Sequence, residues 1–507
     1  MQLSGTILNK MNTGKIQLPV DRLFNLPEKV LQFGTGVLLR GLPDYFIDKA
    51  NKENVFNGRV VIVKSTANGG TDAFKEQDGL YTLVERGVVN DKPVDQVSIN
   101  ASISRVLSAS EEWDEILTCA TNPDIQIIIS NTTEIGIVLD EADAYREIPR
   151  SFPGRVLILL LKRFEHFNGN ADSGMVILPT ELVVDNGNKL KDIILGLAKL
   201  KNCSPRFIQW LEDANDFCNT LVDCIVPGKL PEAEKAAMEQ KLGYADQLMI
   251  MSEPYRLWAI ETKKERTRAI LSFCKTDPSV VLAPDINKFR ELKLRLLNAT
   301  HTFSCGLAYL CGFQTVKEAM QDKYFASFVR RLMLEEIRPM VVNENISNAE
   351  AEEFAIQVLD RFRNPNIEHL WLSITAQYTS KMEMRTVPLV QKYISKENGV
   401  PELMAMGYAA YLLFMRTDKK DDNKFYGYLH GKAYLVNDDK AELMHNHWMN
   451  DTSEKIANEC LYDRDIFGTD LSVYADFTET VQAYLQLLIE KGAENALGFI
   501  LAKKMTA

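Results

Sequence analysis

The stretch KVLQFGTG, residues 29–36, decides the expected fold of the first half of the chain. Its apolar start is typical of a short buried strand, and residues 37–51 have the periodicity of a helix. Between them, Gly34 and Gly36 permit a tight turn and a close approach of the backbone to a pyrophosphate. Strand, Gly-x-Gly turn and helix are the first unit of a dinucleotide-binding domain. Leu39 replaces the third glycine of that pattern, so an ordinary turn is the alternative.

Beyond this unit, strand-like and helical runs alternate up to about residue 285. Strands are expected at 59–64, 80–85, 96–103, 125–130, 175–178 and 221–226, and helices at 111–119, 155–167 and 189–200. Such alternation predicts a mostly parallel sheet that is covered by helices on both faces.

The pattern changes class after about residue 285. Strand-like runs nearly vanish, and amphipathic helical runs are expected at 323–338, 348–362 and 477–491, the last ending at Gly492. The expected fold class is an α/β, Rossmann-type N-terminal domain with a mostly parallel sheet at 1–285, followed by an all-α C-terminal domain at 286–507. A cleft between two such domains is a preferred place for a small-molecule site.

Composition limits the possible partners and the compartment. The chain has 507 residues, too many for one core, and a net charge of −11, which disfavours nucleic acid and anionic membranes as partners. Its eight cysteines include no Cys-x-x-Cys pair, a pattern typical of reduced, intracellular proteins. No signal-peptide core and no apolar run of about 18 residues is present, so a cytoplasmic location is expected.

The second decisive stretch is KLRLLNATH, residues 293–301, which we expect to lie in a helix that begins after Asp285. On a regular α-helix, Asn298 would lie about 140° from Lys293, with His301 between them at about 80°. An amine, an amide and an imidazole would then share one broad polar face. A solvated or hydrogen-bonded helix face is the alternative.

Five stretches together resemble the mannitol dehydrogenase family. They are FGTGVLLRG (33–41), QDGLYTLV (77–84), LVDCIVP (221–227), SEPYRLWAIE (252–261) and KLRLLNATH (293–301), which occur in the family's order over most of the chain. This family contains long-chain polyol and sugar-acid dehydrogenases without a catalytic metal. The resemblance implies a Rossmann-type N-terminal domain, a helical C-terminal domain, NAD(H) as cosubstrate and a site between the domains. The chain length and the stretch PTEL (179–182) are most similar to the tagaturonate reductase (altronate oxidoreductase) group.

The resemblance also assigns site residues. The family's catalytic residues fall on Lys293, Asn298 and His301, and a strand-end pair that borders the family's site falls on Val222 and Asp223. Mannitol-type members carry Cys-Asp-Asn where this chain has Thr180, Glu181 and Leu182, so the family's substrate-contacting asparagine is lost here. Glu181 of this stretch is expected among the substrate-binding residues. An arginine that holds polyol hydroxyls in those members is replaced near Ser373, whereas Lys381 remains. Both differences disfavour a plain polyol as substrate.

Chemistry suggests roles for these groups. Reduction of a ketone by hydride creates an alkoxide, which needs a proton and hydrogen-bond donors. Lys293 is the expected acid in reduction and base in oxidation, and Asn298 and His301 are the expected donors. A uronate carboxylate also needs cations. The candidates in the helical half are Arg361, Arg363, Lys381 and Arg385, with surface ion pairs as the alternative.

The expected cofactor contacts lie at three strand ends. They are Phe33, Gly34, Thr35, Gly36 and Val37 at the glycine turn, Lys64 and Ser65 after strand 59–64, and Thr133 and Glu134 after strand 125–130. The second of these strands ends without the acid that usually contacts the adenosine ribose, so NADP remains open beside NAD.

The expected function is NAD-dependent interconversion of a keto-uronate and its aldonate, tagaturonate and altronate, in a monomer or small homo-oligomer. Fructuronate reductase or a mannitol 2-dehydrogenase-like polyol dehydrogenase is the alternative within the family. A metal-dependent hydrolase or lyase is a remote reading of His445 and His447, because their helical context would turn the two rings apart. A dinucleotide-binding regulator is a third reading. His166, His369 and His430 are expected to be structural or surface residues.

Overall fold

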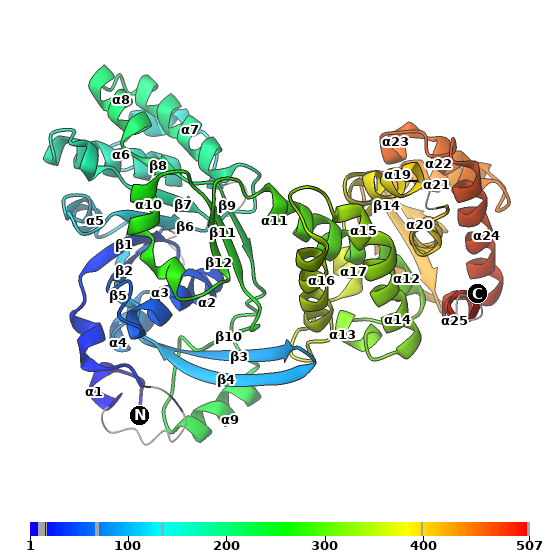
Figure 1. Ribbon diagram of the computed structural model, residues 1–507, viewed down its shortest axis with the longest axis horizontal. Helices are drawn as coiled ribbons and strands as arrows, with labels where there is room; N and C mark the ends of the chain where they lie inside the picture. Colours follow the sequence, from blue (N-terminus) through cyan, green and yellow to red (C-terminus); the bar gives the residue numbers. More distant parts are fainter. Residues whose placement is uncertain (9–15, 17, 66–69, 133–135, 397–398, 504–507) are drawn as a thin grey trace. The chain divides into compact units, whose positions relative to one another are not determined.

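The computed structural model describes residues 1–8, 16, 18–65, 70–132, 136–396 and 399–503. It contains two compact units, one formed by Met1–Arg86 and Pro93–Ile286 and the other by Gly87–Lys92 and Asn287–Ala507. Figure 1 shows both units, with labels on many of their helices and strands.

A six-stranded sheet forms the centre of the first unit (Figure 1). Its strands, in spatial order, are β5 (Ile103–Ser108), β2 (Arg59–Lys64), β1 (Glu28–Phe33), β6 (Ile127–Ser130), β7 (Val176–Pro179) and β8 (Asp216–Phe217). Every neighbouring pair is parallel, which confirms the predicted sheet. The order reverses direction between β1 and β6, and open α/β sheets bind ligands at the carboxyl ends of the strands at such a switch point.

Buried side chains cover both faces of this sheet. Leu31 and Phe33 point to a core formed with α5 (Trp113–Cys119), α6 (Phe152–His166), α7 (Asn186–Leu200) and α8 (Pro205–Asp213). Val30 and Ile62 point to the opposite core, formed with α2 (Val37–Gly41), α3 (Pro43–Lys52), η5 (Ser272–Lys275) and a second sheet. The two faces of β1 and β2 are therefore both apolar, as in parallel sheets generally.

The helix expected at 37–51 is broken into α2 and α3 at Leu42. Leu42 has φ −123° and ψ −79°, outside the helical region, and Pro43 follows it as the first residue of α3. A proline lacks the N–H group of a continuing helix and disfavours helical geometry in the residue before it, which explains the break.

Two other expectations for the sheet differ from the structure. The runs at 80–85 and 96–103 are not central strands, since β3 (Tyr81–Val89) and β4 (Lys92–Asn100) form a separate sheet with β10 (Ile250–Ser252). Asn90 and Asp91 have φ of 52° and 60° at the turn between β3 and β4, the conformation that two-residue hairpins require. The run at 221–226 is β9 (Thr220–Asp223), which belongs to a third sheet with β11 (Leu257–Glu261) and β12 (Val280–Ala283).

The second unit is predominantly helical. Its first continuous stretch consists of α11 (Asn287–Leu292), η6 (Lys293–Ala299) and α12 (Thr300–Leu310). The others that concern the site are α14 (Lys323–Arg331), η7 (Leu332–Ile337), α15 (Arg338–Val341), α16 (Asn348–Phe362), α17 (Trp371–Ile374), α18 (Tyr378–Lys381), η8 (Met382–Thr386) and α19 (Val387–Ser395). The buried helix α20 (Glu402–Phe414) packs between α12 and α24 (Ala475–Lys491), and α24 ends at Gly492 as expected.

One feature of this unit departs from an all-helical pattern. A three-stranded antiparallel sheet is formed by β13 (Lys419–Asp421), β14 (Lys424–Leu429) and β15 (Lys432–Val436). His430 and Gly431, both with positive φ, make the tight turn between β14 and β15. The remaining helices are α13 (Val316–Ala319), α21 (Ala441–Asn450), α22 (Ile456–Tyr462), α23 (Arg464–Phe467) and α25 (Ala493–Lys503).

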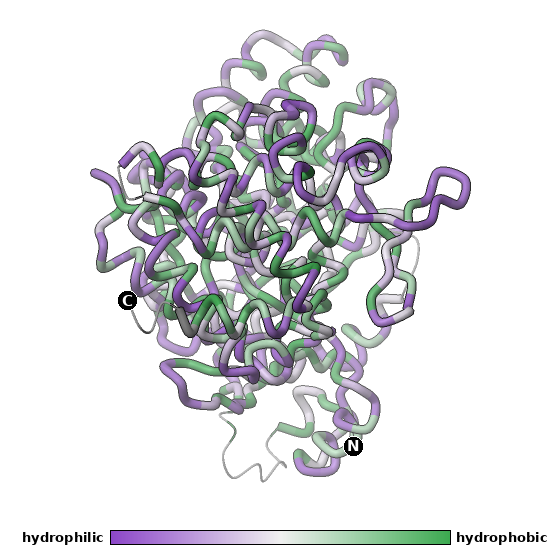
Figure 2. Tube along the Cα trace, turned by 90° about the vertical axis from the view of Figure 1, so that its right-hand side faces the viewer, coloured by the Kyte–Doolittle hydropathy of each residue, from purple (hydrophilic) through white to green (hydrophobic). Residues whose placement is uncertain are grey.

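Hydrophilic and hydrophobic residues alternate over short distances along the trace (Figure 2). Within the part of the chain that the structure describes, no helix has both the length and the apolar character needed to cross a membrane.

Candidate active site

Lys293 and Asn298 lie in η6, a π-helical turn, and His301 lies in the first turn of α12. The regular α-helix expected for this stretch is therefore wrong. A π turn contains more residues than an α turn, so each residue rotates less about the axis. The angle about the helix axis between two side chains five residues apart is then smaller than the roughly 140° of an α-helix. The wide turn thus brings the amine of Lys293 towards the face that carries Asn298.

The described part of the second unit contains two further π-helical turns, η7 and η8, and both pack against η6. Pro339 and Pro388 each follow one of these turns as the second residue of the next helix. A proline inside a helix removes one backbone hydrogen bond and crowds the carbonyl four residues before it, and a widened turn relieves that crowding. The turn η6 contains no proline, and π-helical turns of this kind are frequent at functional sites.

Arg295 joins η6 to η8. Its Nη1 donates to the carbonyl oxygens of Met384 at 3.1 Å and Arg385 at 2.9 Å, and its Nε donates to Glu291 at 3.1 Å. The carbonyl of Met384 lies four residues before Pro388, which has no N–H to donate to it. The guanidinium of Arg295 therefore replaces the missing donor and holds the two π turns together.

His301 is 8% exposed, and its ring contacts three other rings. The ring centroids lie 4.1 Å from Phe362, 5.2 Å from His369 and 5.8 Å from Trp371. Its Nε2 is buried and has no hydrogen-bond partner among the described residues. Because buried polar groups are nearly always paired, an unpaired one marks a position where a ligand group is expected.

Electrostatics keep this imidazole neutral. Burial lowers the pKa of His301 well below its usual value, and four neighbouring basic side chains lower it further. In order of effect they are His369, Arg361, Arg385 and Lys381. A neutral imidazole has one N–H, so His301 acts as a hydrogen-bonding group and not as a cation at neutral pH.

Three of the four predicted carboxylate-binding residues are among these neighbours. Arg361 is buried at the end of α16, Lys381 ends α18, and Arg385 lies in η8. Lys381 donates to the carbonyl of Ile374 at 2.8 Å, and Arg385 donates to the hydroxyl of Thr302 at 3.2 Å. Burial lowers the pKa of Lys381, and the charge of Arg385 lowers it further. An anion placed here would relieve the repulsion among these groups.

The fourth candidate, Arg363, has a different environment. It pairs with Asp91 at the tip of the β3–β4 hairpin and lies 3.7 Å from Asp360, whose carboxylate accepts the backbone N–H of Asn90 at 2.7 Å. These contacts are those of the alternative, a helix-end ion pair, and a role of Arg363 at the substrate stays a prediction.

Glu181, expected at the substrate, is 3% exposed in the first unit. Its Oε1 accepts from the N–H and hydroxyl of Thr132 at 2.8 and 3.0 Å, and its Oε2 accepts from Ser130 at 3.2 Å. Both oxygens accept hydrogen bonds from the end of β6, so Glu181 organises that strand end, and its predicted contact with the substrate stays a prediction.

The glycine turn after β1 allows a ligand to approach the protein backbone closely. Gly34 has φ 131°, and a Cβ there would lie 2.9 Å from Leu39 and 3.3 Å from the carbonyl of Asn131, so only glycine fits. A Cβ at Gly36 would meet nothing within 4 Å, so the space over this residue is open. Leu39, in place of the third glycine, is fully buried in the core below the turn. The turn stands at the switch point of the sheet, where a dinucleotide pyrophosphate is expected.

Two family models match the chain. The model described as the mannitol dehydrogenase Rossmann domain matches residues 28–271, and the model described as the mannitol dehydrogenase C-terminal domain matches residues 285–489. The chain belongs to the mannitol dehydrogenase family. This confirms the resemblance inferred from the five sequence stretches.

Curated relatives in the mannitol dehydrogenase family are similar over almost their whole length. Altronate oxidoreductase from Halalkalibacterium halodurans is 37% identical over 485 residues, covering 94% of this chain and 94% of the relative. Altronate oxidoreductase from Bacillus subtilis is 34% identical over 482 residues, covering 94% and 96%.

Two solved structures share the fold of this chain. The ternary complex of Pseudomonas fluorescens mannitol 2-dehydrogenase with NAD and D-mannitol has a TM-score of 0.67 at 22% identity, covering 99% of this chain and 100% of its own. A D-sorbitol dehydrogenase in substrate-free form has a TM-score of 0.79 at 20% identity, covering 98% and 100%. These likenesses confirm the predicted fold class.

The remaining predicted cofactor and substrate residues of this family member stay predictions. Thr35 and Val37 lie on the turn, but the ring of Phe33 packs 5.1 Å from Phe152 in the core, which leaves only its backbone for a ligand. The others in the described part are Lys64 and Ser65 at the end of β2 and Val222 and Asp223, both buried, at the end of β9. Thr133 and Glu134 lie outside the described residues.

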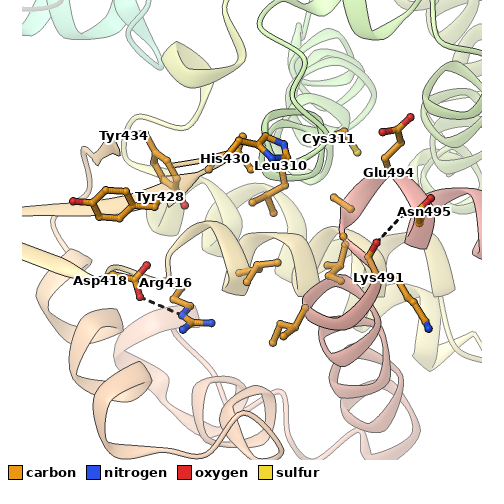
Figure 3. A pocket seen from close by; sticks show the side chains of 16 residues that line it. Leu310, Cys311, Arg416, Asp418, Tyr428, His430, Tyr434, Lys491, Glu494 and Asn495 are labelled. Carbon is orange, nitrogen blue, oxygen red and sulfur yellow. Dashed lines mark hydrogen bonds and ion pairs between the residues drawn. The ribbon is translucent and has the colours of Figure 1, made fainter. Parts of the chain in front are cut away.

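Two features of the second unit lie apart from the predicted mannitol dehydrogenase site. His445 contacts Thr417, and His447 hydrogen-bonds with Asp451 and Asp463, so both rings have protein partners. A cavity of about 430 Å³ is lined by the ends of α12, α20 and α24 and by the β14–β15 turn (Figure 3). In that view Arg416 and Asp418 point towards each other, with Arg416 Nε and Asp418 Oδ1 3.5 Å apart. None of the predicted site residues that the structure describes lines the cavity.

Proposed function

We propose that this protein is a metal-independent, NAD(H)-dependent oxidoreductase that interconverts a keto-uronate and its aldonate, with tagaturonate and altronate as the pair. The observation that carries the proposal is the unpartnered, buried Nε2 of His301 beside the three basic side chains of Arg361, Lys381 and Arg385. The names of the curated relatives, altronate oxidoreductase, support the same substrate pair.

The first unit is proposed to hold the cofactor. The glycine turn and the end of β6 would bind the dinucleotide, NAD by preference, and bound NADH supplies the hydride. The complex of the mannitol 2-dehydrogenase with NAD supports this assignment, as does the open space over Gly36. Lys64 and Ser65 at the end of β2 would lie nearest a 2′-phosphate, so they decide between NAD and NADP.

The second unit is proposed to hold the sugar acid and perform the proton transfer. Lys293 donates a proton to the carbonyl oxygen during reduction and accepts one from the hydroxyl during oxidation. Asn298 and His301 donate hydrogen bonds to that oxygen as negative charge develops on it. Removing one such donor typically costs about 2.7–4 kcal/mol of barrier.

The cations set the substrate class. Arg361, Lys381 and Arg385 would bind the carboxylate at the far end of the sugar, and an arginine can do so with two parallel hydrogen bonds. A neutral polyol would leave these side chains repelling one another, so a polyol dehydrogenase is the less favoured alternative. We further propose a cytoplasmic monomer or small homo-oligomer that binds neither nucleic acid nor membrane, which the net charge of −11 supports.

A substrate panel tests the proposal. NADH oxidation, followed spectrophotometrically, is expected with tagaturonate, more weakly with fructuronate, and least with fructose. Lys293→Ala is expected to abolish turnover and to leave NADH binding, measured by fluorescence titration, within about two-fold of wild type. The matched control is Lys288→Ala, which removes a partly exposed lysine of α11 that pairs with Glu350 at 2.9 Å, and it should retain full activity. Activity with fructose but with no keto-uronate, or turnover in Lys293→Ala, would contradict the proposal.

A further inference from the structure

His369 lies in the segment between α16 and α17, where the sequence predicted only a structural or surface residue. Its backbone is held on both sides by the connection between α12 and α13. The carbonyl of His369 accepts the N–H of Val316 at 2.9 Å, Leu370 bridges to Thr315, and Trp371 donates to the carbonyl of Gln314 at 3.0 Å. The ring of His369 is therefore presented from a fixed backbone position.

The ring of His369 is half-buried and lies 5.2 Å from that of His301, with 41° between the two planes. Within the described chain, neither of its ring nitrogens has a hydrogen-bond partner, so at least one is available to a ligand. The neighbouring carboxylate of Glu368 is already paired with Lys317.

Two cations among the described residues, Arg361 from α16 and Lys381 from α18, act on this ring, and the neutral imidazole of His301 from α12 lies beside it. Burial lowers the pKa of His369, and the charges of Arg361 and Lys381 lower it further. His369 is therefore neutral at pH 7 in the free protein, and a bound anion would reverse the local field and raise its pKa.

We propose that His369, together with Arg361, binds the carboxylate of the sugar acid and determines the preference for an acid over a neutral sugar. This inference rests on the proposed function. Binding draws one proton from solvent onto the neutral imidazole, which then donates a charged hydrogen bond to the carboxylate. His301 remains neutral beside it and serves the reacting oxygen.

Isothermal titration of the aldonate into the enzyme–NADH complex tests this without turnover, because both ligands are then the reduced forms and no hydride can be transferred. Titrations at pH 7 in two buffers of different ionisation enthalpy measure the proton uptake, which is expected in wild type and absent in His369→Gln. A hydrogen bond to a charged group makes the expected loss of affinity about 10- to 100-fold. The matched control is His166→Gln, an exposed histidine at the end of α6, which should change neither quantity.

Steady-state kinetics then separate specificity from positioning. In His369→Gln the KM for the keto-uronate should rise about 10- to 100-fold, while kcat stays within about three-fold of wild type. The kinetic constants for the neutral ketose should not change. A variant that binds the acid as tightly as wild type, with the same proton uptake, would overturn the inference and leave the proposed function intact. Equal losses of kcat for acid and neutral substrates would also overturn it, since His369 would then only support His301. Failure of the wild-type enzyme to bind any sugar acid would overturn both proposals.

Discussion

Removal of the Arg295 guanidinium is the sharpest test of how the site is assembled. Arg295→Met keeps the apolar stem of the side chain but deletes the donor to the carbonyls of Met384 and Arg385. The side chain is 14% exposed, so water replaces these hydrogen bonds only in part. Hydrogen bonds from a charged donor contribute about 1.5–3 kcal/mol each. Partial hydration of the freed carbonyls reduces the expected net loss of stability to about 2–4 kcal/mol.

Differential scanning calorimetry provides the assay for this variant. For a unit of this size, a loss of 2–4 kcal/mol corresponds to a fall in Tm of about 5–15 °C in the transition of the helical unit. Because η6 carries Lys293 and η8 carries Arg385, kcat should fall and the KM for the sugar acid should rise together, while the affinity for NADH holds.

The matched control is Arg331→Met. Among the described residues, Arg331 pairs only with Glu335, at 3.1 Å one helical turn away. A surface pair of this kind contributes about 1 kcal/mol or less. An Arg295→Met protein with the Tm and kinetic constants of the control would refute the argument that Arg295 holds the two π turns in place.

Three further predictions concern groups elsewhere in the two units. Burial raises the pKa of Asp44 from 3.8 to about 7. The free energy of unfolding should therefore decline by up to about 4 kcal/mol as the pH rises from about 4 to about 7. Asp44→Asn should remove this pH dependence, measured by urea unfolding at pH 5 and pH 8. Burial by itself would lower the pKa of His447, but hydrogen bonds with Asp463 and Asp451 raise it. His447→Gln should therefore lose more stability at pH 6 than at pH 9, and an equal loss at both would contradict this. Glu181→Gln should raise the KM for NADH by about ten-fold, the effect of one charged hydrogen bond, and leave the KM for the sugar acid unchanged. A change in the KM for the sugar acid alone would instead support Glu181 as a substrate contact.

Several features of the site are readable from the chain because they depend on local chemistry. The strand, the glycine turn and the helix after it need only neighbouring residues, and only glycine fits the backbone of Gly34. The cations Arg361 and Arg385 were predicted from charge, and Lys381 from charge and from the family resemblance; all three lie around His301. The wide turns η7 and η8 have a sequence signal, a proline two residues into the following helix.

By itself, the sequence determined the parallel sheet, the helical second half and the family, since each rests on residue spacing or on motifs in order. Tertiary structure alone decided the π turn at Lys293–Ala299. No proline in the sequence predicts this turn, and it depends on packing against η8. It also decided that His369 lies beside His301, although 68 positions separate them. A single half-buried histidine in a connecting segment has no periodicity, so only the folded arrangement of α12 and the segment before α17 brings the two rings together.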